Sequence, residues 1–214
     1  DNTGAGGRNT PGYSNPEYDE LAELQVTQPD EDERQQTVYE AQEILARDQP
    51  RTYIANEGGM HPYASARVDN VDPTLGEGLN SFWNMISVTP TDDDTVTMGY
   101  PSEIISLNPM QDLATPDRQF VRLLYDQLFR IGPDGLPQPW LAADEPVIED
   151  DGMTYTVEIR DDVTFHDGED LTIDDVAFTY ELYADSPTYS GLVDVIESIE
   201  TSGNEITFTL GEPY

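Results

Sequence analysis

Residues 150–181 read DDGMTYTVEIRDDVTFHDGEDLTIDDVAFTYE, and this stretch decides the fold class. Apolar and aromatic side chains in its first third alternate with polar ones, which is the period of a half-buried strand (Met153, Tyr155, Val157 and Ile159). A tight turn at residues 165–168 follows, and Thr172 with Asp175 then resembles a helix capping box, with Asp in place of the usual Glu. A hairpin turn, a strand and a capped helix in succession predict a mixed α and β fold.

The rest of the chain adds helices and short strands. Asn15 before Pro16 predicts a helix start, because Asn caps helices and Pro suits their first position. A second helix should begin near Asp30 and end before Pro50, whose ring disfavours the helical conformation in the preceding residue. The pattern further predicts strands at 52–55, 95–100 and 206–210, a short strand or turn at 81–88, a turn at 133–135, and a helix that Thr115-Pro116 caps and that contains Leu128.

The strongly negative charge of the chain indicates the kind of organism that it comes from. It holds 44 Asp and Glu against 9 Lys and Arg, for a formal net charge of −35, and all nine basic residues are Arg. The Debye length is about 8 Å at physiological salt and about 3 Å at 1 M, so concentrated salt is needed to screen such self-repulsion. The composition therefore indicates an extreme halophile, of the haloarchaeal kind, over an ordinary acidic protein.

The same composition excludes several classes of partner. Nucleic acid and anionic membrane surfaces both require basic patches, so neither is an expected partner. No apolar run reaches the roughly 18 residues that a membrane span needs. The absence of Cys removes disulfides, thiolate nucleophiles and thiolate metal ligands.

Three groups of residues suggest a function, and each also has a purely structural interpretation. The run His166-Asp167-Gly168 suggests a metal or catalytic site, or a β-turn that carries a surface His. Adjacent carboxylates could mimic a two-carboxylate hydrolase site, but among 44 acids such pairs are expected by chance. Trp83 and Trp140 are either binding platforms or packing residues. No catalytic motif emerges, and we expect no enzyme, no metal and no cofactor.

One loop remains as the candidate binding site. Met110, Gln111, Asp112 and Thr115 lie between a predicted strand and a predicted helix N-terminus. Open α/β sheets place ligands in such loops, although an ordinary connection is the alternative.

Residues 91–214 carry motifs that resemble the N-terminal region of family 5 extracellular solute-binding proteins, the peptide- and nickel-type receptors of ABC importers. The motifs are the opening segment 95–103, Leu-Asn-Pro at 107–109, the helix ending at 124–130, Pro-Trp-Leu-Ala at 139–142 and the stretch 150–181. Residues 1–90 resemble the C-terminal segment of the same family, through motifs at 12–19, 39–50 and 80–83. A C-terminal segment thus precedes an N-terminal one.

The resemblance implies part of a periplasmic-binding-protein type II-like fold of two lobes, incomplete or circularly permuted, or the junction of two tandem receptor copies. Peptide is the ligand that it implies first, with a nickel complex or an oligosaccharide as alternatives within the family. It also implies ABC permease subunits as partners and an extracellular, cell-surface location with the membrane anchor outside this segment. It places the loop after Asn108 near the ligand cleft. A cell-surface interaction module without transport remains the rival reading.

Overall fold

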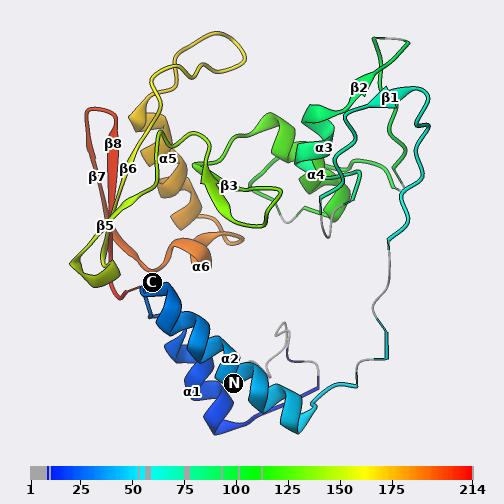
Figure 1. The fold of residues 1–214 in the computed structure, drawn as a ribbon. Coiled ribbons are helices and arrows are strands. Elements are labelled where there is room, and N and C mark those ends of the chain that lie inside the picture. The colour runs from blue at the N-terminus through cyan, green and yellow to red at the C-terminus, as the bar shows by residue number, and fades with distance from the viewer. Residues whose placement is uncertain are drawn as a thin grey trace.

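The computed structural model of the protein describes residues 9, 11–52, 54–55, 59–74, 78–92, 94–100, 102–111 and 113–213. A helical hairpin forms the N-terminal end, and a long connection leads from it to a region of short elements (Figure 1). The C-terminal region forms a four-stranded antiparallel sheet with a helix packed against it. The predicted mixed α and β class is confirmed. Within the described residues, no helix is long and apolar enough to cross a membrane.

The sheet carries the main core of the protein. Its strands are β5 (Val147–Glu149), β6 (Thr154–Glu158), β7 (Ile196–Ser202) and β8 (Glu205–Leu210), in the order β5-β6-β8-β7. All neighbours are antiparallel, Val157 pairs with Ile206, and the register of β7 against β8 shifts between Ile196 and Ser198. The helix α5 (Ile173–Ala184) covers one face of this sheet (Figure 1).

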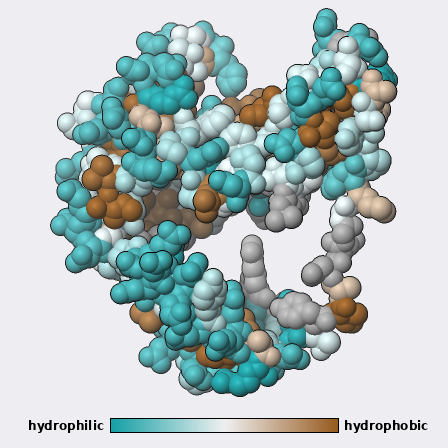
Figure 2. Space-filling view, in the orientation of Figure 1, coloured by the Kyte–Doolittle hydropathy of each residue, from teal (hydrophilic) through white to brown (hydrophobic). Residues whose placement is uncertain are grey.

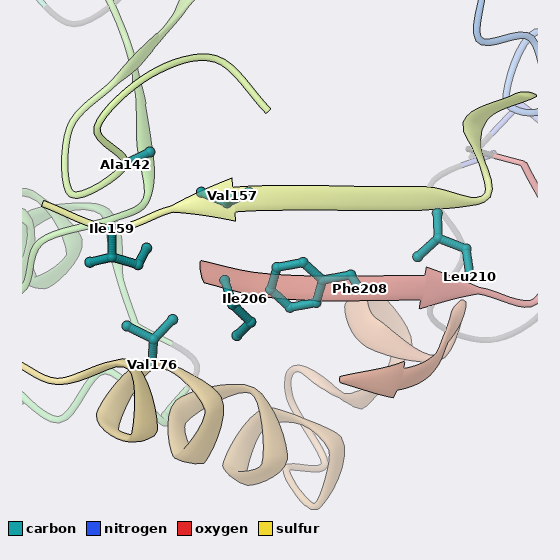
Figure 3. Packing of buried hydrophobic residues seen from close by; sticks show 7 residues of the cluster. All are labelled: Ala142, Val157, Ile159, Val176, Ile206, Phe208 and Leu210. Atoms are coloured by element: carbon teal, nitrogen blue, oxygen red, sulfur yellow. The ribbon is translucent and has the colours of Figure 1, made fainter. Parts of the chain in front are cut away.

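Seven buried apolar residues fill the space between the sheet and α5: Ala142, Val157, Ile159, Val176, Ile206, Phe208 and Leu210. Figure 3 shows Ile159 and Ile206 pointing from the sheet side toward Val176 on the helix. Ile206 is fully buried. Burial of one face explains the alternation seen at 153–159 and 206–210, since successive side chains of a strand point to opposite faces. Both predicted strands are confirmed.

Both turns predicted within residues 150–181 are also present. The short helix η1 (Asp150–Gly152) joins β5 to β6, and its three residues all have positive φ. At the second turn, the N–H of Gly168 donates to the carbonyl of Phe165 at 3.0 Å, with Gly168 at φ +91°. His166 is exposed on that turn. The β-turn interpretation of this run is therefore confirmed.

The capping box predicted for α5 is also confirmed. The carboxylate Oδ2 of Asp175 accepts from the backbone N–H of Thr172 at 2.9 Å and from its hydroxyl at 2.7 Å. The hydroxyl and the backbone N–H of Thr172 together hold the pKa of Asp175 below its usual value of 3.8. The negative charge also suits the positive end of the helix dipole.

We expect Asp175→Ala to lower the free energy of unfolding by about 1 kcal/mol at neutral pH, the usual cost of losing an N-cap interaction. Because the folded-state pKa is depressed, this stabilisation is complete above pH 3.8 and is lost as the pH falls through the folded-state value. Urea unfolding of the two proteins in concentrated salt at several pH values measures it. Asp174→Ala, which removes the same charge one residue earlier, is the control. Equal effects of the two substitutions would contradict a specific capping role.

The helical hairpin consists of α1 (Pro16–Leu24) and α2 (Glu31–Asp48), as predicted. The side chains of Asn15 and Asp30 accept backbone N–H groups in the first turns of these two helices. The two helix ends are joined at Asp48, whose Oδ2 accepts from Tyr13 Oη at 2.8 Å and from the Asn15 amide at 2.7 Å. These bonds and the neighbouring Arg47 lower the pKa of Asp48 to about 2.

The hairpin meets the sheet near the loop between its helices. Pro29 lies so close to Gly152 that a Cβ added to Gly152 would come within 3.0 Å of the proline ring. Figure 1 shows the C-terminal end of the chain beside this loop. Figure 2 shows that hydrophilic residues cover most of the visible face of the hairpin. Gly152 is therefore required both by its positive φ and by this close approach.

The region of short elements contains β1 (Val68–Asp69), α3 (Phe82–Ser87), β2 (Thr89–Pro90), α4 (Thr115–Leu124), β3 (Phe129–Ile131) and β4 (Pro137–Pro139). Strand β1 pairs with β2, and β3 pairs with β4 through the turn predicted at 133–135. The last short helix, α6 (Ser190–Val193), follows α5.

A cluster around Arg130 joins α3 to the β3–β4 hairpin; we call Phe82, Trp83, Asp126, Arg130 and Trp140 the Arg130 cluster. The guanidinium carbon lies 3.9 Å from the ring centre of Phe82 and 5.0 Å from that of Trp140. Its Nη2 donates to Asp126 at 2.8 Å, although Arg130 is only 4% exposed. The cluster thereby connects the segment of residues 1–90 with the segment of residues 91–214.

Three predictions about strands are wrong for the described residues. Residues 81–88 contain the helix α3, because the Ser81 hydroxyl accepts the N–H of Asn84 at 3.2 Å and caps it. Residues 95–100 lie outside any strand, since no neighbouring strand pairs with them within the described chain. The same holds for residues 52, 54 and 55, while Tyr53 lies outside the described residues.

The prediction for α4 is right about the helix but wrong about its ends. Ala114 occupies the N-cap position without a side-chain bond, and Thr115 is the first helical residue. The helix ends at Leu124, so Leu128 lies beyond it. Arg130 explains this end, because its Nη2 donates to the carbonyls of Arg122 and Tyr125 at 3.1 and 3.2 Å. A cation at the negative end of the dipole stabilises such a stop.

Candidate functional site

The candidate site is the loop that leads into α4; we call residues 106–115, of which Asp112 is not described, the Asn-Pro loop. Its centre is a tight turn at Asn108. The side-chain Oδ1 of Asn108 accepts the N–H of Met110 at 3.0 Å, and its carbonyl accepts the N–H of Gln111 at 3.2 Å. The Ser106 hydroxyl spans the base of the turn, donating to Gln111 Oε1 at 2.8 Å and accepting the Asn108 N–H at 3.2 Å.

The helix α4 holds the two ends of the loop. Asp117 is 3% exposed and accepts the backbone N–H of Ile105 at 2.9 Å. Arg118 donates to the carbonyl of Leu113 at 2.9 Å, and the side chain of Leu113 is buried. A carboxylate in the first turn of a helix is favoured by the dipole, so Asp117 both fixes the loop and suits its own position.

A third attachment comes from a distant part of the chain. The hydroxyl of Tyr189 donates to the carbonyl of Pro109 at 2.5 Å, across 80 positions of sequence. Tyr189 is the N-cap residue of α6. The turn at Asn108 is thus tied to the helical segment that follows α5.

The structure brings three of the five predicted site residues together. Asn108, Met110 and Gln111 share the turn, with Asn108 and Gln111 exposed and Met110 half-buried. Thr115 is exposed at the start of α4, outside the hydrogen bonds of that turn. Asp112 lies outside the described residues. Sequence reasoning missed Tyr189, because no local pattern marks a contact between residues so far apart.

A cavity lies where residues 60–92 meet residues 95–99. This cavity of about 470 Å³ is lined by residues 60–64, by side chains around α3 and by residues 95–99. Apolar residues such as Val68 and Met98 share its walls with the polar side chains of His61 and Asp92. The side chain of Asn84 is buried in its wall, donating to the carbonyl of Leu79 at 2.7 Å and accepting the N–H of Asp72 at 2.9 Å. That amide shapes the wall of the cavity.

The tryptophans serve packing in this structure. Trp83 donates its Nε1–H to the carbonyl of Ile131, and Trp140 donates its own to Asp126, each at 2.8 Å. Their rings meet edge to face at 5.8 Å within the Arg130 cluster. Across the described residues, no three His, Asp or Glu side chains are grouped as metal ligands would be.

Comparison with known proteins identifies the part of the chain that holds the sheet. The family model described as "Bacterial extracellular solute-binding proteins, family 5 Middle" matches residues 137–214. This range contains all four strands of the main sheet, α5, α6 and Tyr189. Every residue of the core cluster also lies within it. This part of the chain is therefore similar to that family.

Two curated relatives are similar to parts of the chain. The nickel-binding periplasmic protein of Escherichia coli (strain K12) is 30% identical over 126 residues, which are 56% of this chain and 24% of the relative. The oligopeptide-binding protein AppA of Bacillus subtilis (strain 168) is 41% identical over 66 residues, or 28% of this chain and 12% of the relative. By name these relatives are binding proteins. The chain spans about a quarter or less of their length.

Among solved structures, that of AppA from Bacillus subtilis in complex with a nonapeptide is 29% identical with a TM-score of 0.43. The similarity covers 48% of this chain and 21% of that one.

Proposed function

We propose that the chain is part of an extracellular receptor that binds a small solute, in the first place a peptide, for an ABC importer. The observation that carries the proposal is the family match over residues 137–214, which coincides with the buried core and its sheet. In such a receptor the chemistry of transport belongs to other subunits. The protein therefore acts as a binding protein without catalysis, and its partners are permease subunits in the membrane.

The Asn-Pro loop is our proposed contact with the ligand. Its exposed side chains at positions 108 and 111 are amides, which both donate and accept hydrogen bonds. Main-chain groups of a peptide need such partners, whereas nickel favours imidazole ligands. Peptide is thus the first candidate. A nickel complex is the second, because one relative is named as a nickel-binding protein.

We further propose that residues 1–90 correspond to a C-terminal receptor segment and residues 91–214 to an N-terminal one. The Arg130 cluster supports this arrangement, because it packs Phe82 and Trp83 of the first segment against Arg130 and Trp140 of the second. Ends of one receptor that lie together would make such contacts in a permuted chain or at a tandem junction. The receptor would act at the surface of a halophilic archaeon, attached to the membrane outside this segment.

Isothermal titration in concentrated salt tests the function. We expect the chain to bind a polyalanine oligopeptide and to bind Ni²⁺, with or without histidine, far more weakly. Gln111→Ala should weaken peptide binding about fivefold, the effect of one net hydrogen bond. Gln35→Ala, the same change on the exposed surface of α2, is the matched control. Tighter binding of nickel than of peptide would favour the second candidate, and binding of neither would contradict the receptor function.

A further inference from the structure

The hydroxyl of Tyr189 donates to the carbonyl of Pro109 at 2.5 Å, the shortest hydrogen bond between the described residues of the Asn-Pro loop and the rest of the fold. Among the described residues, the other hydrogen bonds of the turn at Asn108 are all local. The remaining hydrogen bonds of the turn run among Ser106, Asn108, Met110 and Gln111 themselves. In the part of the chain that the structure describes, Tyr189 therefore makes the one long-range hydrogen bond to this turn.

Tyr189 is itself held by a chain of aromatic rings that begins in the core. The ring of Phe208, a buried core residue, lies 4.7 Å from that of Tyr180 on α5. Tyr180 meets Tyr183 edge to face at 6.0 Å, and Tyr183 lies 5.1 Å from Tyr189. Aromatic pairs at such separations attract one another beyond the burial of their area. Burial of these rings raises the pKa of Tyr180 to about 12 and also raises the pKa of Tyr183.

The backbone around Tyr189 adds a second restraint. Its N–H donates to the carbonyl of Ser186 at 3.2 Å, and its carbonyl accepts the N–H of Leu192 at 2.8 Å. Ser186 is buried. The backbone of Tyr189 is thus fixed by the helical segment of residues 186–193 and its ring by Tyr183, so its hydroxyl is a firm point of attachment.

We propose that Tyr189 is a positioning residue for the ligand-binding loop: through the row Phe208, Tyr180, Tyr183 and Tyr189, the core of the sheet sets the position of the turn at Asn108. The inference rests on the proposed function in assigning that turn to the ligand. Tyr189 acts through the Pro109 carbonyl and leaves contact with ligand to the amide side chains of the loop. Loop order, and with it ligand affinity, then depends on a residue that belongs to a different part of the fold.

The test is Tyr189→Phe, which keeps the ring and removes only the hydroxyl. Without ligand, hydrogen exchange of the Met110 and Gln111 amides should rise about fivefold, as expected for one lost hydrogen bond. Exchange of the Ile206 and Phe208 amides and the urea midpoint should stay unchanged. Tyr39→Phe is the matched control, because it removes a hydroxyl from an exposed tyrosine of α2, outside the aromatic row and the loop. Unchanged exchange at the turn in Tyr189→Phe would overturn the inference.

The second measurement is titration of the same variants with the polyalanine oligopeptide. Binding should weaken about fivefold in Tyr189→Phe and remain at the wild-type value in Tyr39→Phe. A loosened turn with wild-type affinity would show that the turn does not position ligand, which overturns the inference and leaves the receptor function standing. If the wild-type chain binds no peptide, the proposed function fails, and the exchange measurement still decides whether Tyr189 holds the turn.

Discussion

Dialysis of the protein from molar to millimolar salt is expected to remove its cooperative fold. Carboxylates three or four residues apart on a helix lie about 6 Å from one another. That distance is within the Debye length at physiological salt, about 8 Å, and beyond that at 1 M, about 3 Å. With 44 acids and 9 Arg, the unscreened repulsion acts on a net stability that for a domain is only about 5–15 kcal/mol. The folded state should therefore become the minor one.

The helical hairpin should be lost first. It carries eleven carboxylates and two arginines between residues 15 and 48, including the pairs Glu17 with Glu20 and Glu40 with Glu43. Among its residues only Thr37 and Ile44 are buried, so little apolar packing opposes the repulsion. Far-UV circular dichroism during dialysis measures the loss of helix.

Two controls separate screening from other effects of salt. Sucrose at matched osmolality lacks ions and should not restore the helical signal. Glu20→Gln combined with Glu23→Gln should lower the salt concentration at the midpoint, whereas Gln35→Asn, at an exposed neutral position, should leave it unchanged. A full helical signal in millimolar salt would contradict the prediction and the halophilic origin that we propose.

Arg130→Ala is expected to cost about 3 kcal/mol of unfolding free energy, a large part of the total. The substitution removes a buried cation that contacts two aromatic rings and donates to two carbonyls at the end of α4. The carboxylate of Asp126 is half-exposed, so it can return to water, which limits the loss. Even so, the carbonyls of Arg122 and Tyr125 and the two rings all lose their shared partner.

The two tryptophans provide a direct readout, because the chain has only two and both belong to the Arg130 cluster. Urea unfolding in concentrated salt, followed by tryptophan emission, therefore reports on this junction. Arg130→Lys keeps the charge but lacks the planar fork, so we expect it to lose a substantial part of the stability. Arg34→Met, at an exposed arginine of α2, should change stability by less than about 1 kcal/mol. An Arg130→Ala midpoint equal to that of the wild type would show that the cluster is not an energetic junction.

The elements that the sequence predicted correctly depend on near neighbours. Asn15 and Asp30 cap their helices through contacts within three residues, and Thr172 reaches Asp175 in the same way. The alternating strands around Val157 and Ile206 also show their period locally. Such features need no knowledge of the remaining fold.

The features that the sequence did not reveal depend on distant partners. Residues 95–100 alternate like a strand but pair with no strand in the described part of the chain, and the end of α4 is set by Arg130 from beyond the helix. In the candidate site, the turn at Asn108 follows from its own side chain, whereas its attachment to Tyr189 spans 80 residues. Composition and periodicity carry no information on such contacts.

The exposed edge of the main sheet affects whether copies of the protein associate. Strand β7 ends the order β5-β6-β8-β7, and an unpaired edge is a template for strands of another copy. In dilute salt, Glu197 and Glu200 would repel a second edge, but the concentrated salt that we expect this fold to require would screen that repulsion. Resistance to self-association must then come from shape. The irregularity between Ile196 and Ser198 breaks the straight run of β7, and the opposite edge, β5, offers only three residues.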